Sequence, residues 1–245
     1  MIATVIDAVG VVLPAHDEED LIRESLRGVR AALRGLDGQC RTAVTVVLDR
    51  CTDRTPSRVA AELAGWAGAQ VLPVHHRPAG TGVGYLRDLG VRDIVRRLSP
   101  VAPERIWLLS TDADTTVPES WVAEHLRHAR AGAHGVAGLA ELSGEPGLSA
   151  EALEHYRTIL DDGMNGDTHQ HVYAANLGLR ADVYHRCGGF PLEGPGEEHR
   201  LWQTMSTGGH RLHRPTQPRV RTSARLRGRA EGGLADLLRG ITERR

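Results

Sequence analysis

The sequence predicts an α/β fold with a mostly parallel, Rossmann-like central sheet flanked by helices. Short apolar runs alternate with amphipathic helical segments through the first 131 residues. This order is typical of parallel sheets with right-handed crossovers. Several of the apolar runs end in acidic residues or run into a glycine-rich loop. Because ligands of such sheets bind outside the carboxyl ends of the strands, these endings indicate a binding site.

The overall composition narrows the class of protein. The 245 residues suffice for one sizeable α/β domain, and 40% of them are hydrophobic. A formal net charge of −1 argues against nucleic acid as a partner, since phosphate binding usually needs surplus positive charge. The chain contains no lysine, so all 30 of its permanently basic residues are arginine. This excludes a Walker-A loop and a lysine Schiff base.

The cysteines and the apolar runs indicate the cellular compartment in which the protein is expected. The three cysteines are scattered and lack metal-ligand spacing, so free thiols in a reducing environment are expected. The first ten residues lack the features of a signal peptide, and no apolar run approaches about 18 residues. We therefore expect a cytoplasmic protein with at most peripheral membrane contact.

The first half of the chain divides into four strand–helix units. Near-continuous apolar runs predict buried strands at residues 9–13, 43–48, 71–74 and 106–109. Apolar positions at helical spacing predict helices over residues 21–36, 56–63, 85–98 and 119–131. His16 or Asp17 would cap the first helix, and Pro118 lies near the start of the last. The glycine-rich loop over residues 77–84 precedes the third helix.

The pattern changes after residue 133. We expect a strand over residues 134–142, a helix over 149–160, and a strand over 169–180 that crosses the site. Helices follow over residues 181–186 and from the Glu197-Glu198 pair to residue 206. Residues 220–245 form an arginine-rich tail. No internal repeat or long linker interrupts the chain, so a single domain is expected.

Asp112 and Asp114 follow the fourth strand one residue apart. In an extended chain their side chains point the same way, and two convergent carboxylates repel each other unless a cation lies between them. Carboxylate oxygens select Mg²⁺ or Mn²⁺, whose remaining positions phosphate oxygens commonly fill. Alternatively, Asp112 caps the following helix and Asp114 is solvated. Asp49 and the glycine-rich loop also follow strands, and this convergence favours a metal-bridged phosphate site.

The order of these motifs, from residue 9 to about 233, resembles the family 2 glycosyltransferases of the GT-A fold. Leu86 and Asp88 depart from the family pattern Ala-Arg-Asn-x-Gly, and Glu198 replaces the usual second acid, Asp. The segments that carry the resemblance are Leu13-Pro14-Ala15-His16-Asp17-Glu18, residues 47–55 with Asp49, residues 84–90 with Gly84 and Arg87, Asp112-Ala113-Asp114, residues 176–180 and 187–191, and Glu197-Glu198.

The resemblance implies one GT-A domain over residues 1–245. Residues 1–132 would bind the nucleotide sugar, residues 133–219 would form a smaller mixed acceptor-side region, and residues 220–245 a basic tail. The implied activity is metal-dependent transfer of a sugar from a UDP- or GDP-sugar to a hydroxyl acceptor, with inversion. The nucleotide-sugar site would comprise Pro14, Ala15, Glu18, Asp49, Gly84, Arg87, Asp112, Ala113, Asp114 and Arg225.

Roles within this site follow from the same resemblance. Asp114 is the expected metal ligand, and Asp112 binds the metal or the ribose. Glu198 would remove the proton from the acceptor hydroxyl, with Glu197 an equal chemical candidate. Taken alone, the two glutamates also fit the acidic first turn of a helix.

The remaining ligands are less defined. His213 is the preferred third metal ligand, although each of the four candidate histidines also fits a packing or surface role; the other three are His169, His171 and His210. Arg87 and Arg225 would contact the diphosphate, or else decorate a helix and a solvated tail.

Two other functions remain open on the same residues. Asp112-x-Asp114-x-Thr116 fits the Asp-x-Asp-x-Thr pattern of haloacid-dehalogenase-like phosphatases, in which the first Asp is the nucleophile. That family places the motif on its first strand and uses a later lysine, whereas here three strands precede it and lysine is absent. A catalytically inactive GT-A scaffold that only binds a nucleotide is the third possibility.

Overall fold

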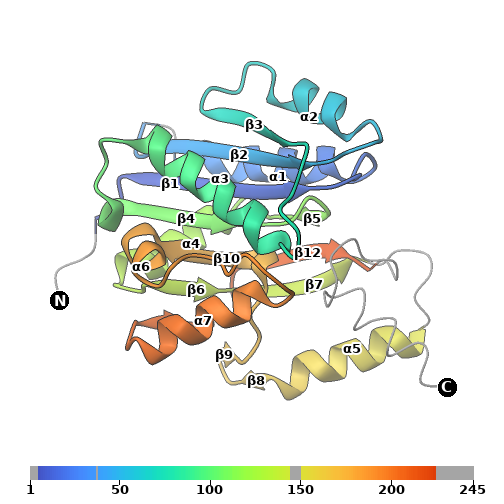
Figure 1. Ribbon diagram of the computed structural model, residues 1–245. Helices are drawn as coiled ribbons and strands as arrows, with labels where there is room; N and C mark the ends of the chain where they lie inside the picture. Colours follow the sequence, from blue (N-terminus) through green and yellow to red (C-terminus); the bar gives the residue numbers. More distant parts are fainter. Residues whose placement is uncertain (1–4, 37, 144–149, 225–245) are drawn as a thin grey trace.

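The computed structural model describes residues 5–36, 38–143 and 150–224. A seven-stranded sheet with the order β11-β6-β10-β4-β1-β2-β3 forms its centre (Figure 1). Strand β10 (Leu177–Arg180) runs antiparallel to both of its neighbours, and the other neighbouring pairs are parallel. The predicted fold class, a mostly parallel sheet flanked by helices, is therefore confirmed.

The other strands of this sheet follow the predicted apolar runs. All eight residues of β1 are buried, as expected for a strand covered on both faces. In the first half of the chain the observed strands and helices begin and end within two residues of the predicted bounds. The strands are β1 (Ala8–Ala15), β2 (Arg41–Asp49), β3 (Ala69–Val74), β4 (Ile106–Ser110), β6 (Gly135–Ala137) and β11 (Leu212–His213).

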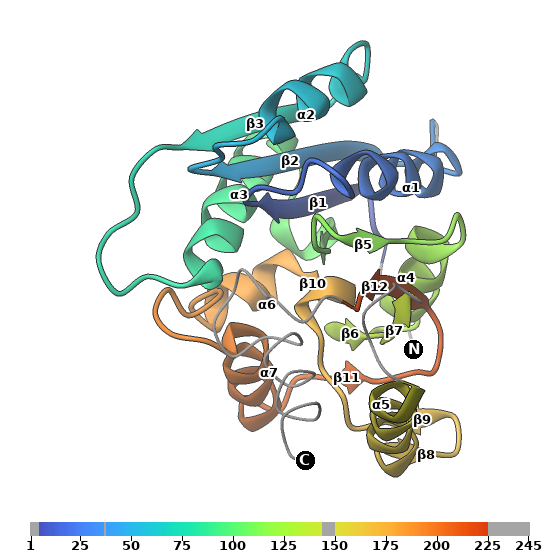
Figure 2. The ribbon, with the colours of Figure 1, turned by 90° about the vertical axis from the view of Figure 1, so that its right-hand side faces the viewer.

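Helices cover both faces of the sheet (Figures 1 and 2). One face packs against α3 (Val83–Leu98), α6 (Ala181–Arg186) and α7 (Glu197–Thr207). The other packs against α1 (Ile22–Arg34), α2 (Thr55–Leu63) and α4 (Trp121–Arg130). Gly10 lets α3 lie close to β1, because a Cβ there would be 2.2 Å from Ile94 Cγ2. Within the described ranges, no helix combines the length and the apolar character that crossing a bilayer requires.

A smaller region lies beside the main sheet. Its three-stranded sheet has the order β5-β12-β7. The predicted tail is wrong at its beginning, because residues 220–223 belong to β12, and residues 225–245 lie outside the described residues. The elements of this region are β5 (Thr115–Thr116), β7 (Leu139–Ser143), α5 (Ala150–Asp162), β8 (Met164–Asn165), β9 (Thr168–His169) and β12 (Arg219–Ser223). The described residues also form the 3₁₀ turns η1 (Pro103–Arg105) and η2 (Ala174–Asn176).

Two predicted strands are wrong. The strand expected over residues 134–142 divides at Gly138 into β6 and β7, which belong to different sheets. The strand expected over 169–180 is interrupted: β9 lies at its start and β10 at its end, with the 3₁₀ turn Ala174–Asn176 before β10. Both breaks meet at one side chain, since a Cβ on Gly138 would lie 2.3 Å from Asn176 Nδ2.

Asn176 explains this interruption. Its Nδ2 donates to the carbonyls of Leu139 and Pro218, both at 2.9 Å. Its Oδ1 accepts a hydrogen bond from Trp121 Nε1 at 2.8 Å and contacts His125 Nε2 at 3.0 Å. The side chain is fully buried, so it joins the two sheets and helix α4 through one amide. Asn176, which the family resemblance placed in an acceptor-side segment, thus lies in the core.

We expect Asn176→Ala to lower the free energy of unfolding by about 3 kcal/mol, because it removes the four buried polar contacts of this amide, including those of Trp121 Nε1 and His125 Nε2. Urea denaturation measures this loss. Asn165→Ala, at an exposed position of β8, should change the free energy by less than about 0.5 kcal/mol. Equal stability of the two variants would contradict the assigned role.

Candidate functional site

The carboxyl ends of β1, β2 and β4 lie at one edge of the sheet. β1 pairs in parallel with both β2 and β4, so Ala15, Asp49 and Ser110 all lie at or near that edge. Ligands of open α/β sheets bind outside this edge. The expected donor-site residues Pro14, Ala15, Asp49, Asp112 and Asp114 therefore gather where the fold class predicts.

The backbone around Asp112 and Asp114 is fixed from two sides. Ser25 Oγ of α1 donates to the Asp112 carbonyl at 3.1 Å, and the Ser223 amide of β12 donates to the Asp114 carbonyl at 3.1 Å. Ala113 between them is buried, and both aspartates are half-buried. Helix α4 begins at Trp121, so the alternative in which Asp112 caps that helix is wrong.

Arg87 connects Asp112 to helix α7. Its side chain is 3% exposed. Nη2 lies 2.5 Å from Asp112 Oδ1, Nε donates to Glu197 Oε1 at 3.1 Å, and Nη1 donates to Ser110 Oγ at 2.7 Å. Burial alone would lower the pKa of Arg87, but the charges of Asp112 and Glu197 outweigh it and raise the pKa above its usual value. Each of the three nitrogens is already bonded to protein, which does not favour the predicted contact with the diphosphate.

Glu197 and Glu198 occupy the first turn of α7, after Gly196 with φ 73°. Their surroundings differ. Glu197 is buried and bonded to Arg87, whereas the side chain of Glu198 is 19% exposed. Burial and the neighbouring Glu197 charge raise the pKa of Glu198 to about 7. Of the two candidates, Glu198 is thus the carboxylate that is accessible and basic.

Gly84 has a packing role in this arrangement. A Cβ there would lie 2.1 Å from the Pro191 carbonyl oxygen and 2.9 Å from Glu197 Cβ. Glycine therefore lets the start of α3 contact the chain that leads into α7. Gly84 was expected to contact the nucleotide sugar, but its observed neighbours are Pro191 and Glu197.

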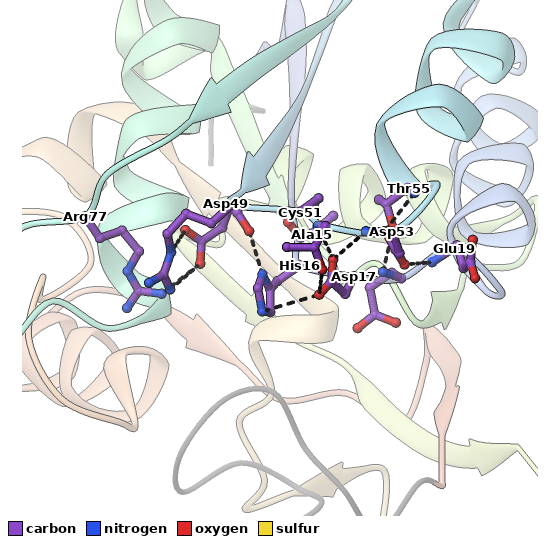
Figure 3. Close-up of polar contacts among 12 residues, drawn as sticks. Ala15, His16, Asp17, Glu19, Asp49, Cys51, Asp53, Thr55 and Arg77 are labelled. Atoms are coloured by element: carbon purple, nitrogen blue, oxygen red, sulfur yellow. Dashed lines mark hydrogen bonds and ion pairs between the residues drawn. The ribbon is translucent and has the colours of Figure 1, made fainter.

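A second ionic cluster surrounds Asp49 at the end of β2 (Figure 3). Asp49 Oδ1 accepts from Arg50 Nε at 3.0 Å, and Oδ2 accepts from Arg77 Nη1 at 3.0 Å. Burial would raise the pKa of Asp49, but these two arginines hold it below its usual range. His16 Nδ1 lies 2.6 Å from the Asp49 carbonyl oxygen.

Arg50 and Arg77 were not predicted as site residues. The sequence contained a signal for these two residues. Because the chain has no lysine, arginines next to the strand ends supply the permanent positive charge at this edge. Arg50 also has a positive φ of 47°, which few non-glycine residues adopt. The resulting turn directs its guanidinium back onto Asp49.

The turn after β1 corrects another prediction. Asp17, with φ 50°, accepts hydrogen bonds from the amides of Thr52 at 2.6 Å and Asp53 at 3.2 Å (Figure 3). Helix α1 begins at Ile22 and has no side-chain cap. Asp17 therefore holds the β2–α2 loop instead of capping α1. The next residue, Glu18, is buried, and its amide donates to Thr55 Oγ1 at 2.7 Å.

The structure does not bring His213 to the aspartate pair. His213 Nδ1 lies 3.4 Å from His128 Nδ1 of α4, and His210 similarly pairs with His134. His169 Nε2 contacts the Pro215 carbonyl and His171 Nε2 the Leu160 carbonyl. Among the described residues, no group of three or more His, Cys, Asp or Glu side chains is arranged to hold a metal ion. Arg225 lies outside the described residues.

The aspartate pair still fits one common way in which proteins bind Mg²⁺ or Mn²⁺. Such ions are commonly held by one or two carboxylates, and substrate phosphates and water complete the coordination. Asp112 and Asp114 supply carboxylates that solvent reaches. Arg87 Nη2 is bonded to Asp112 Oδ1, and within the described part of the chain no protein contact to Oδ2 is found. Asp112 can therefore contact Arg87 and a cation at the same time.

Comparison with protein families and solved structures agrees with this architecture. The model of glycosyl transferase family 2 matches residues 10–188. Sequence comparison with curated proteins finds no match. A Pyrobaculum calidifontis mannosyltransferase solved with GDP-Man and Mn²⁺ superposes with a TM-score of 0.66 at 18% identity, over 92% of this chain and 59% of that one.

Two further structures show the same fold. GalNAc-T7 with UDP, GalNAc and Mn²⁺ has a TM-score of 0.61 at 12% identity, over 90% of this chain and 44% of that one. Mycobacterium tuberculosis glucosyl-3-phosphoglycerate synthase has a TM-score of 0.53 at 18% identity, over 96% and 77%. This chain spans less than two thirds of the length of the first structures it matches. The predicted GT-A fold is confirmed, and by its sequence the chain belongs to glycosyl transferase family 2.

Proposed function

We propose that this chain transfers a glycosyl group from a nucleoside-diphosphate sugar to a hydroxyl acceptor, with a divalent cation and with inversion. One observation carries the proposal. Arg87 is bonded to both Asp112 and Glu197, which places the two aspartates and the first turn of α7 at the same opening of the sheet. A donor held at the aspartates would therefore present its sugar to Glu198.

The roles of the residues follow from charge and exposure. Asp114, with Asp112, would hold Mn²⁺ or Mg²⁺ against the diphosphate. The cation, when bound, neutralises charge that develops on the leaving diphosphate. Glu198 would accept the proton of the acceptor hydroxyl as its oxygen attacks the anomeric carbon, because a raised pKa suits a general base. Direct attack from the side of Glu198 gives inversion.

The nucleoside would lie near Asp49, beyond the end of β2. Structural relatives bind GDP-Man in one case and UDP in others, and both classes of nucleotide remain candidates here. In the cluster of Asp49, Arg50 and Arg77, the two guanidinium groups offer hydrogen-bond donors and the buried Asp49 carboxylate offers an acceptor. Pro14 and Ala15 at the end of β1 would line the adjacent wall.

The phosphatase alternative finds little support. The chain has no lysine, and the strands β1, β2 and β3 precede the Asp112-x-Asp114 motif, which that family places on its first strand. The family match also favours the transferase. An inactive nucleotide-binding scaffold would have the same contacts, so only turnover separates it from an active enzyme.

We expect Asp114→Ala to abolish sugar transfer and the stabilisation by nucleotide with Mn²⁺, because half of the carboxylate pair is lost. In the wild type, nucleoside diphosphate at about 100 times its Kd should stabilise the fold by about 2.7 kcal/mol in the presence of Mn²⁺. Thermal unfolding with UDP or GDP measures this. Asp161→Ala, at an exposed position of α5, serves as the control and should behave as wild type. Retained stabilisation in Asp114→Ala would refute the metal assignment.

Glu198→Gln should lower kcat by about two to four orders of magnitude while donor affinity stays near the wild-type value, because only the proton acceptor is removed. Steady-state kinetics and calorimetric titration of the donor separate the two quantities. Glu104→Gln, at the opposite end of β4, is the matched control. If Glu198→Gln retains wild-type turnover, Glu198 is not the base.

The pH profile gives a separate check on Glu198. Because the base acts when deprotonated and its pKa is raised to about 7, kcat/KM should rise as the pH increases from 6 to 8. The residual rate of Glu198→Gln should lack this rise. A flat wild-type profile over this interval would contradict the assignment.

A further inference from the structure

Arg87 holds an unusual position between two parts of the site. It lies on α3, is bonded to Asp112 after β4, and is bonded to Glu197 at the start of α7. Asp112 is 25 residues away in sequence and Glu197 is 110 residues away. One guanidinium therefore joins the proposed donor-metal site to the helix that carries the proposed base.

The geometry of this connection is restrictive. A guanidinium is planar, and its donors have fixed directions, so a movement of one carboxylate is passed to the other. Both neighbours of Glu197 in this region are tightly packed, because Arg87 is 3% exposed and a Cβ on Gly84 would lie 2.9 Å from Glu197 Cβ. Glu198 is the next residue in the same helical turn, so its position follows that of Glu197.

The same contacts argue against a direct contact between Arg87 and the donor. Nε, Nη1 and Nη2 each have a protein oxygen as partner, and solvent hardly reaches the side chain. Moving Arg87 onto a phosphate would leave Glu197 buried without its cation, which is unfavourable. Its effect on the reaction must therefore pass through Asp112 and Glu197.

We propose that Arg87 is a positioning residue that transmits occupancy of the donor-metal site at Asp112 to Glu198 on helix α7. The inference rests on the proposed function, in which Asp112 faces the donor and Glu198 is the base. A cation held by Asp112 would restrict the orientation of this carboxylate, whose Oδ1 is bonded to Arg87. Arg87 in turn holds Glu197, so occupancy of the donor site would hold Glu198 toward the acceptor more firmly than in the ligand-free protein.

Arg87→Lys tests this link, since an ammonium keeps the charge but lacks the planar fork that reaches both carboxylates. The matched control is Arg97→Lys in the same helix. Arg97 is also partly buried and paired with an aspartate, Asp93 at 3.0 Å, but that pair lies away from the aspartates and from α7. The probes are UDP and GDP, each with Mn²⁺.

Hydrogen exchange of the amides at residues 201–207 reports on α7 independently of turnover. In the wild type and in Arg97→Lys, nucleotide with Mn²⁺ should slow exchange of these amides about tenfold. In Arg87→Lys the slowing should disappear and kcat should fall about 100-fold, while the nucleotide Kd stays within about threefold of the wild-type value. A higher donor concentration should restore neither the slowing of exchange nor kcat in Arg87→Lys.

Glu197→Gln provides a second route if Arg87→Lys does not fold. It breaks the α7 side of the link and leaves Asp112 bonded, so α7 should again lose its response to nucleotide with Mn²⁺. Combining the two substitutions should add little to either alone, as expected for residues acting through one contact.

The possible results are distinct. Nucleotide Kd weakened tenfold or more in Arg87→Lys would make Arg87 a donor ligand and overturn the inference. An unchanged response of α7 in Arg87→Lys would also overturn the inference. If the wild type transfers sugar in that case, the proposed function still holds. Conversely, the response of α7 could depend on Arg87 in a protein that transfers no sugar. This result would support the link and contradict the proposed function. A wild type that binds neither nucleotide with Mn²⁺ would overturn both.

Discussion

The ion pairs of one buried arginine hold the candidate site together. Arg87 lies between β4, α3 and α7, with Asp112 and Glu197 as its counter-charges and Ser110 Oγ as a third acceptor. A charge so deeply buried is tolerated only with such partners, and loss of one partner leaves the rest uncompensated. Asp112 at the sheet edge and Glu197 on α7 are therefore held by the same buried guanidinium.

Arginine also organises the other end of the site. Arg50 and Arg77 approach Asp49 from different directions, and their forks fit carboxylate oxygens in a way that a lysine ammonium does not. In a chain without lysine, each cation at the sheet edge thus brings a fixed geometry as well as charge. The Asp49 carboxylate at this edge is consequently held in a defined orientation by the two guanidinium groups.

The first half of the fold could be predicted because local patterns determine it. Apolar runs such as residues 9–13 are buried on both faces, and strand ends placed Asp49, Asp112 and Asp114 at one edge. Contacts between distant residues could not be predicted in this way. Asp17 has the residue type of a helix cap, yet the amides it binds lie 35 and 36 residues later. His213 faces His128 because β11 pairs with β6, a register that no spacing in the sequence reveals.

Glu197 and Glu198 illustrate how the fold assigns roles that chemistry leaves equal. The two side chains are identical and adjacent, but consecutive residues of a helix point about 100° apart. Only one can face Arg87, and the left-handed Gly196 together with the close contact at Gly84 sets which one. Glu197 becomes the buried counter-ion of Arg87, and burial together with the Glu197 charge raises the pKa of Glu198 to about 7.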